Sequence, residues 1–246
     1  MATKKNGTEV TALVPVTEYA VMKDETRIGD IIKANMGGRT LLPSDLDRLV
    51  VPSQGNTSWK IETIDGESYT PEVFGVIIYH KMARARWDKS IEEAGGESRP
   101  PVCRCDNMAN PIGVGNPGGL CSQCPFNVWG SGKNGRGFGC PQRHILFIYG
   151  EHGALPFVIS APPGSLKNVG KYFTRLSTFS RIYWSVVTRF ALEKHTSPVV
   201  HAQIVCSVAS KLDGEMLEKF KKLSADMEPI LASMPITRDD TASNGE

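Results

Sequence analysis

The chain lacks the features that mark membrane and secreted proteins. No apolar run approaches the roughly 20 residues that a membrane-spanning helix needs. The first residues, MATKKNGTEVTALVPVTEYA, are polar and rich in threonine, without the apolar stretch of a signal peptide. We therefore expect a cytoplasmic protein that does not contact a membrane and that begins with a flexible arm over residues 1–16.

Motifs of nucleotide binding and hydrolysis are also missing. Neither G-x-x-x-x-G-K-[ST] nor G-x-S-x-G occurs, and no helix pattern follows the glycine-rich stretch GSGKNGRGFG. HExxH is absent, as is the H-x-E plus P-C-x-x-C signature of zinc deaminases. Without a catalytic constellation, the sequence predicts a protein that is not an enzyme.

Cysteines, by contrast, are concentrated in one place. Five of the six lie between Cys103 and Cys140 in the pattern C-x-C-x15-C-x2-C-x15-C. Disulfides are rare in cytosolic proteins, whereas a thiol cluster with a C-x2-C pair is typical of tetrahedral Zn²⁺ sites. The residues between the cysteines are too rich in Gly and Pro to form a packed core. We therefore expect Zn²⁺ to hold an insertion at about residues 100–143.

The chemistry around the thiols indicates a structural metal. Cys121, Cys124 and Cys140 are firm ligand candidates, while Cys103 and Cys105, two apart on an extended segment, compete for the fourth position. A catalytic zinc normally keeps an open position beside an acid or base. Asp106 is the one acidic residue from Cys103 to Cys140, and this window has no histidine. His144 is a weaker ligand candidate, and Cys206 reads as a small buried hydrophobe.

Charge is unevenly distributed although the net charge is only +2. From Trp129 to Lys194 the chain has nine Lys or Arg against two Glu, and from His195 onward five against eight Asp or Glu. The first 128 residues carry fourteen basic and sixteen acidic residues. A basic middle region followed by a mildly acidic end favours a polyanionic ligand, although a solvated basic face gives the same count.

The order of the expected elements suggests a fold of the α+β class, mainly β. Outside the cysteine insertion, hydrophobic periodicity predicts a long strand, two short strands, a helix and a β-hairpin, with further helices near both ends. We expect the long strand from Thr70, the short strands at HILFIYGE and ALPFVISA, the helix at SLKNVGKYFTRLSTFS with Ser165 as its N-cap, and the hairpin at RIYWSVVTRFALEK and VVHAQIVCSV. We expect the further helices at residues 17–36 and at GEMLEKFKKLSADMEPILASM, and a strand around Trp59 to Ile64.

This order is that of a five-stranded OB-fold barrel, with the zinc-binding loop inserted between strands 1 and 2. The domain would span residues 17–234, followed by a disordered tail over 235–246. A generic α+β sandwich is the alternative architecture.

An OB barrel binds single strands with Lys and Arg along the backbone and aromatic rings under the bases. Some of the candidates also have a plain structural role: Trp129 could cover the metal, and Lys171 with Arg175 could form a solvated helix face. The nucleic-acid-binding candidates are Tyr79, Lys81, Arg84, Arg86, Trp87, Trp129, Lys133, Arg136, Arg143, Tyr149, Lys171, Tyr183 and Arg189.

Several stretches resemble one family. PPVCRCDNM, CSQCPFNVWGSG, GCPQRHILFIYG and LKNVGKYFTRL, with LPSDLDRLVVPSQGNTSW and FGVIIYHKMARARW upstream, are similar to zinc-containing, OB-fold single-stranded DNA-binding proteins of phages and mobile elements. The resemblance spans about residues 25–195, and Cys124–Ser131 is its most specific part. It implies Cys103 as the fourth zinc ligand, with Cys105 as a departure from the family pattern. It also implies a non-catalytic accessory of replication or recombination in a bacterial cytoplasm, with proteins of those processes as further partners.

Three functions remain open at this stage. The first is sequence-nonspecific binding of single-stranded DNA with a structural zinc bracing the groove. The second is a zinc-dependent nuclease or deaminase acting on single strands, with Asp106 as its acid or base. The third is an adaptor for protein interaction or transcription that docks through the zinc loop.

Overall fold

A computed structural model describes residues 25–39, 42–52, 55–89, 100–150, 153, 155–196 and 200–241, and the predicted arm over 1–16 lies outside these ranges. The described part is mixed α/β, and none of its helices is long and apolar enough to cross a bilayer. Its α-helices are α1 (Glu25–Asn35), α2 (Leu166–Thr178) and α3 (Gly214–Ser233). Its strands are β1 (Arg48–Leu49), β2 (Trp59–Thr63), β3 (Gly66–Thr70), β4 (Glu72–Arg86), β5 (Cys103–Cys105), β6 (Ile112–Gly115), β7 (Gly119–Leu120), β8 (Gln142–Tyr149), β9 (Phe157–Ala161), β10 (Val186–His195) and β11 (His201–Lys211).

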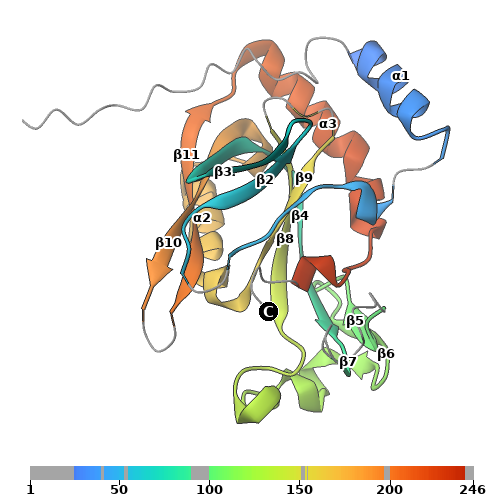
Figure 1. Ribbon diagram of the computed structural model, residues 1–246, viewed down its shortest axis with the longest axis vertical. Coiled ribbons are helices and arrows are strands. Elements are labelled where there is room, and N and C mark those ends of the chain that lie inside the picture. The colour runs from blue at the N-terminus through green and yellow to red at the C-terminus, as the bar shows by residue number, and fades with distance from the viewer. Residues whose placement is uncertain are drawn as a thin grey trace, which may run out of the picture.

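The long strand β4 is the centre of a nine-stranded sheet with the order β1-β9-β8-β4-β5-β6-β7, and β10 and β11 branch from it (Figure 1). Strand β8 pairs antiparallel with Val76–Arg84, and β10 pairs with Glu72–Gly75 at the start of the same strand. The end of β4 pairs with β5, the first strand of the cysteine-containing insertion. One strand therefore connects every part of the sheet.

Both faces of β4 are covered, which explains its continuous apolar stretch. Val76, Ile77 and Ile78 are all fully buried. Val76 and Ile78 belong to a core shared with α3, whereas Ile77 belongs to a second core shared with α2. Each helix removes apolar surface of the sheet from water, and each large side chain buried in this way contributes about 2 kcal/mol. The structure is therefore layered, helix against sheet against helix, around β4.

The predicted order of strands and helix is confirmed, but the predicted closure is not found. The long strand, the two short strands, α2 and the hairpin β10–β11 follow one another as expected. A five-stranded barrel would close by pairing β9 with β11. Among the described residues these two strands do not pair, so the sheet does not form a closed barrel.

A side chain bridges the place where β9 and β11 fail to pair. Ser165, just after β9, is fully buried, and its Oγ accepts a hydrogen bond of 3.0 Å from the backbone N–H of Ile204 in β11. Ser165 precedes α2 as predicted, but its side chain makes no capping bond to that helix. Its hydroxyl satisfies a buried strand N–H instead, because the neighbouring strand leaves that donor without a partner.

Replacing Ser165 with Ala should lower the free energy of unfolding by about 1–3 kcal/mol, because the Ile204 N–H would stay buried without an acceptor. Urea denaturation of the variant measures the change. Ser177→Ala is the matched control, since the exposed Ser177 hydroxyl bonds only to the Phe173 carbonyl within α2. Equal stability of the two variants would contradict a role for Ser165 in joining the strands.

The elements before β4 were predicted only in part. The expected strand near Trp59 is confirmed as β2, and it forms a hairpin with β3. Trp59 is fully buried, and its Nε1 donates to the Phe190 carbonyl at 3.2 Å. Strand β1, which the sequence did not predict, pairs parallel with β9. The helix expected over 17–36 is described from Glu25 to Asn35, and its earlier part lies outside the described residues.

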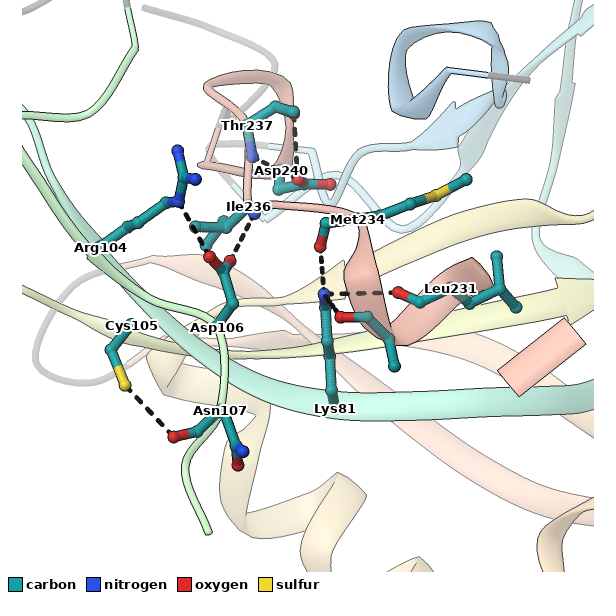
Figure 2. Close-up of polar contacts among 11 residues, drawn as sticks. Lys81, Arg104, Cys105, Asp106, Asn107, Leu231, Met234, Ile236, Thr237 and Asp240 are labelled. Carbon is teal, nitrogen blue, oxygen red and sulfur yellow. Dashed lines mark hydrogen bonds and ion pairs between the residues drawn. The ribbon is translucent and has the colours of Figure 1, made fainter. Parts of the chain in front are cut away.

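The prediction of a disordered tail from residue 235 is wrong for residues 235–241. Ile236 is 1% exposed and packs in the core shared with α3. The Asp240 carboxylate accepts from the Thr237 N–H at 2.7 Å (Figure 2). It also pairs with Arg48 Nε at 3.0 Å. The composition of this stretch is polar, but its polar groups find partners in the body. Residues 242–246 lie outside the described ranges.

Candidate metal centre and nucleic-acid interface

The cysteine segment, residues 100–141, lies at one end of the sheet beyond the last residues of β4 (Figure 1). In β5, Cys103 is opposite Arg86 and Cys105 is opposite Arg84. Residues two apart on a strand point to the same side, so both thiols face the same way. The β4–β5 pairing therefore fixes the first two thiols, and the turns that follow bring the other three to them.

All five thiol-bearing residues of the segment line a single cavity of about 10 Å³. This volume suits one small sphere about the size of a water molecule or an ion. Cys103, Cys105, Cys121 and Cys140 are buried, and Cys124 is half-buried. As they lie, however, no three Cys, His, Asp or Glu side chains in the described residues converge closely enough to hold a metal. Ligation would require the thiols to turn toward the centre of the cavity.

The chemistry of the donor set suits a soft divalent cation. Burial raises the pKa of the Cys121 thiol to about 11 and that of Cys140 to about 12. The Arg84 guanidinium, which also lines the cavity, acts in the opposite direction on both thiols. A buried thiolate needs a compensating positive charge, and Zn²⁺ bound to sulfur supplies it. The residues present therefore fit the predicted metal.

Both candidates for the fourth ligand, Cys103 and Cys105, lie close to the other thiols. Cys103, Cys121 and Cys124 each raise the pKa of Cys140 through the proximity of their charges. The Cys105 thiol instead donates to the Asn107 carbonyl at 3.4 Å (Figure 2). It also shares a hydrogen bond with Cys121, so Cys105 lies within the thiol group as Cys103 does.

The backbone of the segment passes so close to the thiols that it requires glycine. A Cβ added to Gly113 would lie 3.0 Å from Cys103 Sγ. At Gly115, which has a φ of +118°, a Cβ would lie 2.2 Å from the Val102 carbonyl oxygen. Only glycine tolerates both the left-handed backbone and the close approach. The glycines that make an independent core impossible are thus what allow the chain to wrap around the cavity.

Asp106, the candidate acid for a catalytic zinc, is used elsewhere. One carboxylate oxygen accepts from Arg104 Nε at 2.9 Å, and the other accepts from the Ile236 N–H at 2.7 Å (Figure 2). Asp106 does not line the cysteine cavity. This arrangement supports a structural link between the cysteine segment and the C-terminal segment, and gives the nuclease or deaminase hypothesis no support.

The outer surface of the cysteine segment is aromatic and basic. Trp129 is 73% exposed and meets the Phe138 ring edge to face at a centroid distance of 5.7 Å. Lys133 and Arg136 are exposed on the loop between these rings. Residues 107–150 contain no Asp or Glu. Trp129 is not among the residues that line the cysteine cavity.

Five other predicted contact residues lie on the side of the sheet that faces α3 or the C-terminal segment. A register shift between Ile77 and Tyr79 and the packing of α3 place them there. Burial contradicts nucleic-acid contact for Lys81 and Tyr149, whereas the other three are half-buried. Lys81 and Tyr149 are buried, Tyr79 packs against Phe147, Trp87 lies under the Arg238 guanidinium, and burial lowers the pKa of Arg143 to about 10.

Arginines predicted to contact phosphate are largely engaged within the protein. Arg84 donates to the Cys140 carbonyl at 2.9 Å, and the Arg86 guanidinium lies 4.0 Å from the centre of the Phe126 ring. Both hold the cysteine segment to β4. Arg189 forms a bidentate ion pair with Glu72 across β4 and β10. These arginines support the fold, and a phosphate would have to displace their partners.

Of the remaining candidates, Lys171 is exposed on α2, and Tyr183 is half-buried in an aromatic group. That group lines a cavity of about 570 Å³ between α2 and the sheet, which the sequence did not reveal. Its lining includes His80, Met82, His144, Phe173, Arg181 and Tyr183. The two histidines were visible in the sequence, but only the β4–β8 register brings them together.

The histidines of this aromatic cavity are neutral near pH 7. His144 Nε2 and His80 Nδ1 share a hydrogen bond of 3.0 Å. Burial lowers the pKa of His80 to about 4 and, together with His80, that of His144 to about 3. The Phe173 ring stacks on His144 at 5.1 Å. The rings of His80, His144, Phe173 and Tyr183 are thus an uncharged part of the cavity wall, beside the cation of Arg181.

Successive side chains on one side of β4 line the aromatic cavity and then the cysteine cavity. His80 and Met82 line the first, and Arg84 lines the second. Alternate residues of a strand share one side, so these three side chains and Arg86 follow one another along the same side. From His80 to Arg86 the distance along the strand is about 20 Å.

Searches against protein-family models, curated proteins and solved structures find no match to this chain. Its function therefore has to be inferred from these surfaces.

Lys81 illustrates how a predicted contact residue acts in the fold. Its Nζ donates to the carbonyls of Leu231, Ala232 and Met234 at the C-terminal end of α3 (Figure 2). A cation at this end also interacts favourably with the helix dipole. Burial lowers the Lys81 pKa, while Asp106 and Asp240 act in the opposite direction. Lys81 thus caps the C-terminal end of α3.

Lys81→Met should lower the free energy of unfolding by about 2 kcal/mol, because three helix carbonyls lose their donor. Thermal and urea denaturation measure this loss. Affinity for an oligothymidylate should stay the same in the folded variant. Unchanged stability with weakened DNA binding would restore the original expectation for Lys81.

Proposed function

We propose that the protein binds single-stranded DNA without sequence preference and without a reaction of its own. The observation that carries the proposal is the exposed pair Trp129–Phe138, with Lys133 and Arg136 beside it on a stretch free of acidic residues. Exposed aromatic rings stack on unpaired bases, each worth about 1–3 kcal/mol, and cations neutralise the phosphates between them. A large exposed aromatic pair on a soluble surface otherwise costs free energy and is uncommon.

The strand arrangement supports this proposal. The pairs β4–β8, β8–β9, β4–β10 and β10–β11, with α2 between β9 and β10, are those of an OB-like architecture. Only the pairing of β9 with β11 would be needed to complete it. In such proteins, loops beside the central strands bind oligonucleotides, and the cysteine segment is inserted in the corresponding loop between β4 and β8.

The aromatic cavity extends the proposed surface. From the cysteine segment, the bound DNA strand would follow the side of β4 that carries Arg86, Arg84, Met82 and His80. It would then reach the rings of His144 and Phe173. Neutral rings suit unpaired bases of any identity, because every base has an aromatic face. In a duplex those faces are stacked on each other, so the surface favours single strands.

Zinc is the proposed resident ion of the cysteine cavity. Cys103, Cys121, Cys124 and Cys140 would hold it, and a fully thiolate-bound ion is structural. It would fix the cysteine segment so that Trp129 and Phe138 are presented at a constant position. Ordering these loops before binding lowers the entropy cost of binding DNA.

Native mass spectrometry should find one Zn²⁺ per chain in protein purified without chelator. Removal of the metal should loosen residues 103–143 while the sheet stays folded, because the strands have two apolar cores of their own. Hydrogen exchange checks the location of the change, and Cys140→Ser should mimic it. Cys206→Ser is the matched control, since Cys206 lies outside the segment. A single cooperative loss of all structure would mean that the segment is integral to the core.

Fluorescence titration with an oligothymidylate should give tight binding that weakens as salt increases, because binding to phosphates releases counterions. Trp129→Ala should reduce the affinity roughly tenfold, the equivalent of about 1.4 kcal/mol from one stacked base. Tyr69→Ala is the matched control, as Tyr69 is an aromatic residue of similar exposure on the β2–β3 hairpin.

The same titration with duplex DNA and with oligouridylate defines the ligand class. Equal affinity for the duplex would overturn the proposal, and a strong preference for oligouridylate would reassign it to RNA. Absence of binding to all three, with recovery of a defined protein partner, would favour the adaptor hypothesis. That hypothesis has one observation in its favour, the exposed apolar residues Ile112, Val114 and Leu120 on β6 and β7.

A further inference from the structure

A separate cavity of about 490 Å³ lies between the C-terminal end of α2 and β11, away from the cysteine segment. Arg175 and Leu176 from α2, Phe179 and Arg181 from the turn after it, and Lys211 at the end of β11 line it. A volume of this size is typical of pockets for small ligands. Of these residues the sequence pointed only to Arg175, as part of a helix face, and the cavity itself was not predicted because β11 is remote from α2 in sequence.

The cavity carries three positive charges without any negative one. Arg175, Arg181 and Lys211 are exposed, and no Asp or Glu lines the cavity. Among the described residues, the side chains of these three form no ion pair or hydrogen bond. They differ in this respect from Arg84 and Arg189, whose partners lie within the protein. Three unpaired cations around one hollow attract a phosphate.

The turn after α2 presents an aromatic ring at the same place. The Arg181 N–H donates to the Leu176 carbonyl at 2.8 Å and closes the helix end. Ser180 adopts a left-handed backbone with a φ of 53°, which is uncommon for a residue other than glycine. The turn leaves Phe179 71% exposed at the rim of the cavity. A base could stack on this ring while its phosphate lies among the cations.

Arg181 connects this cavity with the proposed DNA path. It lines both the basic cavity and the aromatic cavity that contains His80 and His144. A DNA strand that leaves the aromatic cavity would therefore reach the basic cavity next. The two hollows and the cysteine segment form one succession along the α2 side of the protein.

We propose that the basic cavity holds one phosphate-bearing nucleotide of the bound single strand. Arg175, Arg181 and Lys211 contact the phosphate, and Phe179 stacks on the base. The proposal rests on the proposed function and adds a second anchoring point, at the opposite end of the path from Trp129. The occupant is a nucleotide within a strand, whose neighbours occupy the aromatic cavity.

The decisive variant is Arg175→Gln with Lys211→Gln, because neither residue lines the aromatic cavity or the cysteine cavity. Fluorescence titration with an oligothymidylate should give roughly tenfold weaker binding, and the slope of log affinity against log salt should fall by about 0.7 for each phosphate that the variant no longer neutralises. Lys222→Gln, an exposed charge change on α3, should alter affinity by less than about twofold. Both exposed substitutions leave the apolar cores intact, and thermal denaturation verifies folding.

Ultraviolet cross-linking locates the bound nucleotide directly. With the wild-type protein and oligothymidylate, peptide mapping should find a cross-link at Phe179, and at equal DNA concentration below saturation the double variant should give a much lower yield of it. Phe179→Ala should weaken binding at least fivefold without changing the salt slope, since it removes stacking but no charge.

The outcomes separate the two proposals. If the double variant binds oligothymidylate as tightly as the wild type and cross-links form only at Trp129, the nucleotide pocket is wrong and the proposed function still holds. No binding of any oligonucleotide overturns both. If thymidine 5′-monophosphate alone binds as tightly as the oligonucleotide, the cavity serves a free nucleotide and its assignment to the strand is wrong.

Discussion

Burial of β4 on both faces constrains everything else in this protein. A strand of 15 residues packs against the α3 core along one side, and on the other side Val73 and Ile77 pack in the core shared with α2. The second side is open only from His80 onward, where its side chains line the aromatic cavity and the cysteine cavity. Its two ends remain for other tasks. The first residues pair with β10, and the last pair with β5 and carry the cysteine segment. Because the side chains of alternate residues belong to different cores, the α2 side is the one that leads outward to Arg84 and Arg86. The candidate binding surfaces therefore lie along that side and at its ends.

The cysteine segment folds without a packed apolar core of its own. Its glycines let the chain wrap closely around five thiols, but they leave almost nothing to bury. Hydrogen bonds tie it inward, such as the Ser131 hydroxyl to the Phe126 carbonyl and the Arg84 guanidinium to the Cys140 carbonyl. Its large apolar side chains, Trp129 above all, point outward instead. A segment that is held by such hydrogen bonds and has no apolar core of its own can expose aromatic rings that a hydrophobic core would otherwise bury.

Much of the fold could be predicted from local patterns, and the candidate site only in part. Long apolar runs identified β4, β8 and both later helices, since periodicity reflects nearby residues. The spacing of the cysteines also indicated that they would gather. The sequence misled where burial depends on partners far along the chain. Lys81 and Tyr149 were expected on an open face because one covered face is the usual case for an antiparallel strand, but α3 covers the other face as well. Arg175, Phe179 and Lys211 were not recognised together, because only the docking of β11 beside α2 creates their cavity.

The carboxylate of Asp106 couples the cysteine segment to the C-terminal segment. It lies one residue after Cys105 and bonds to both Arg104 and the backbone of Ile236. An interaction that orders residues 103–106 therefore also favours the attached form of the C-terminal segment. Attachment of the C-terminal segment favours order in residues 103–106 by the same coupling free energy, because linkage between two equilibria is reciprocal. The C-terminal segment in turn touches Arg48 and the Trp87 ring through Asp240 and Arg238. Order in the cysteine segment is thus coupled to the attachment of residues 236–240, far from the thiols in sequence.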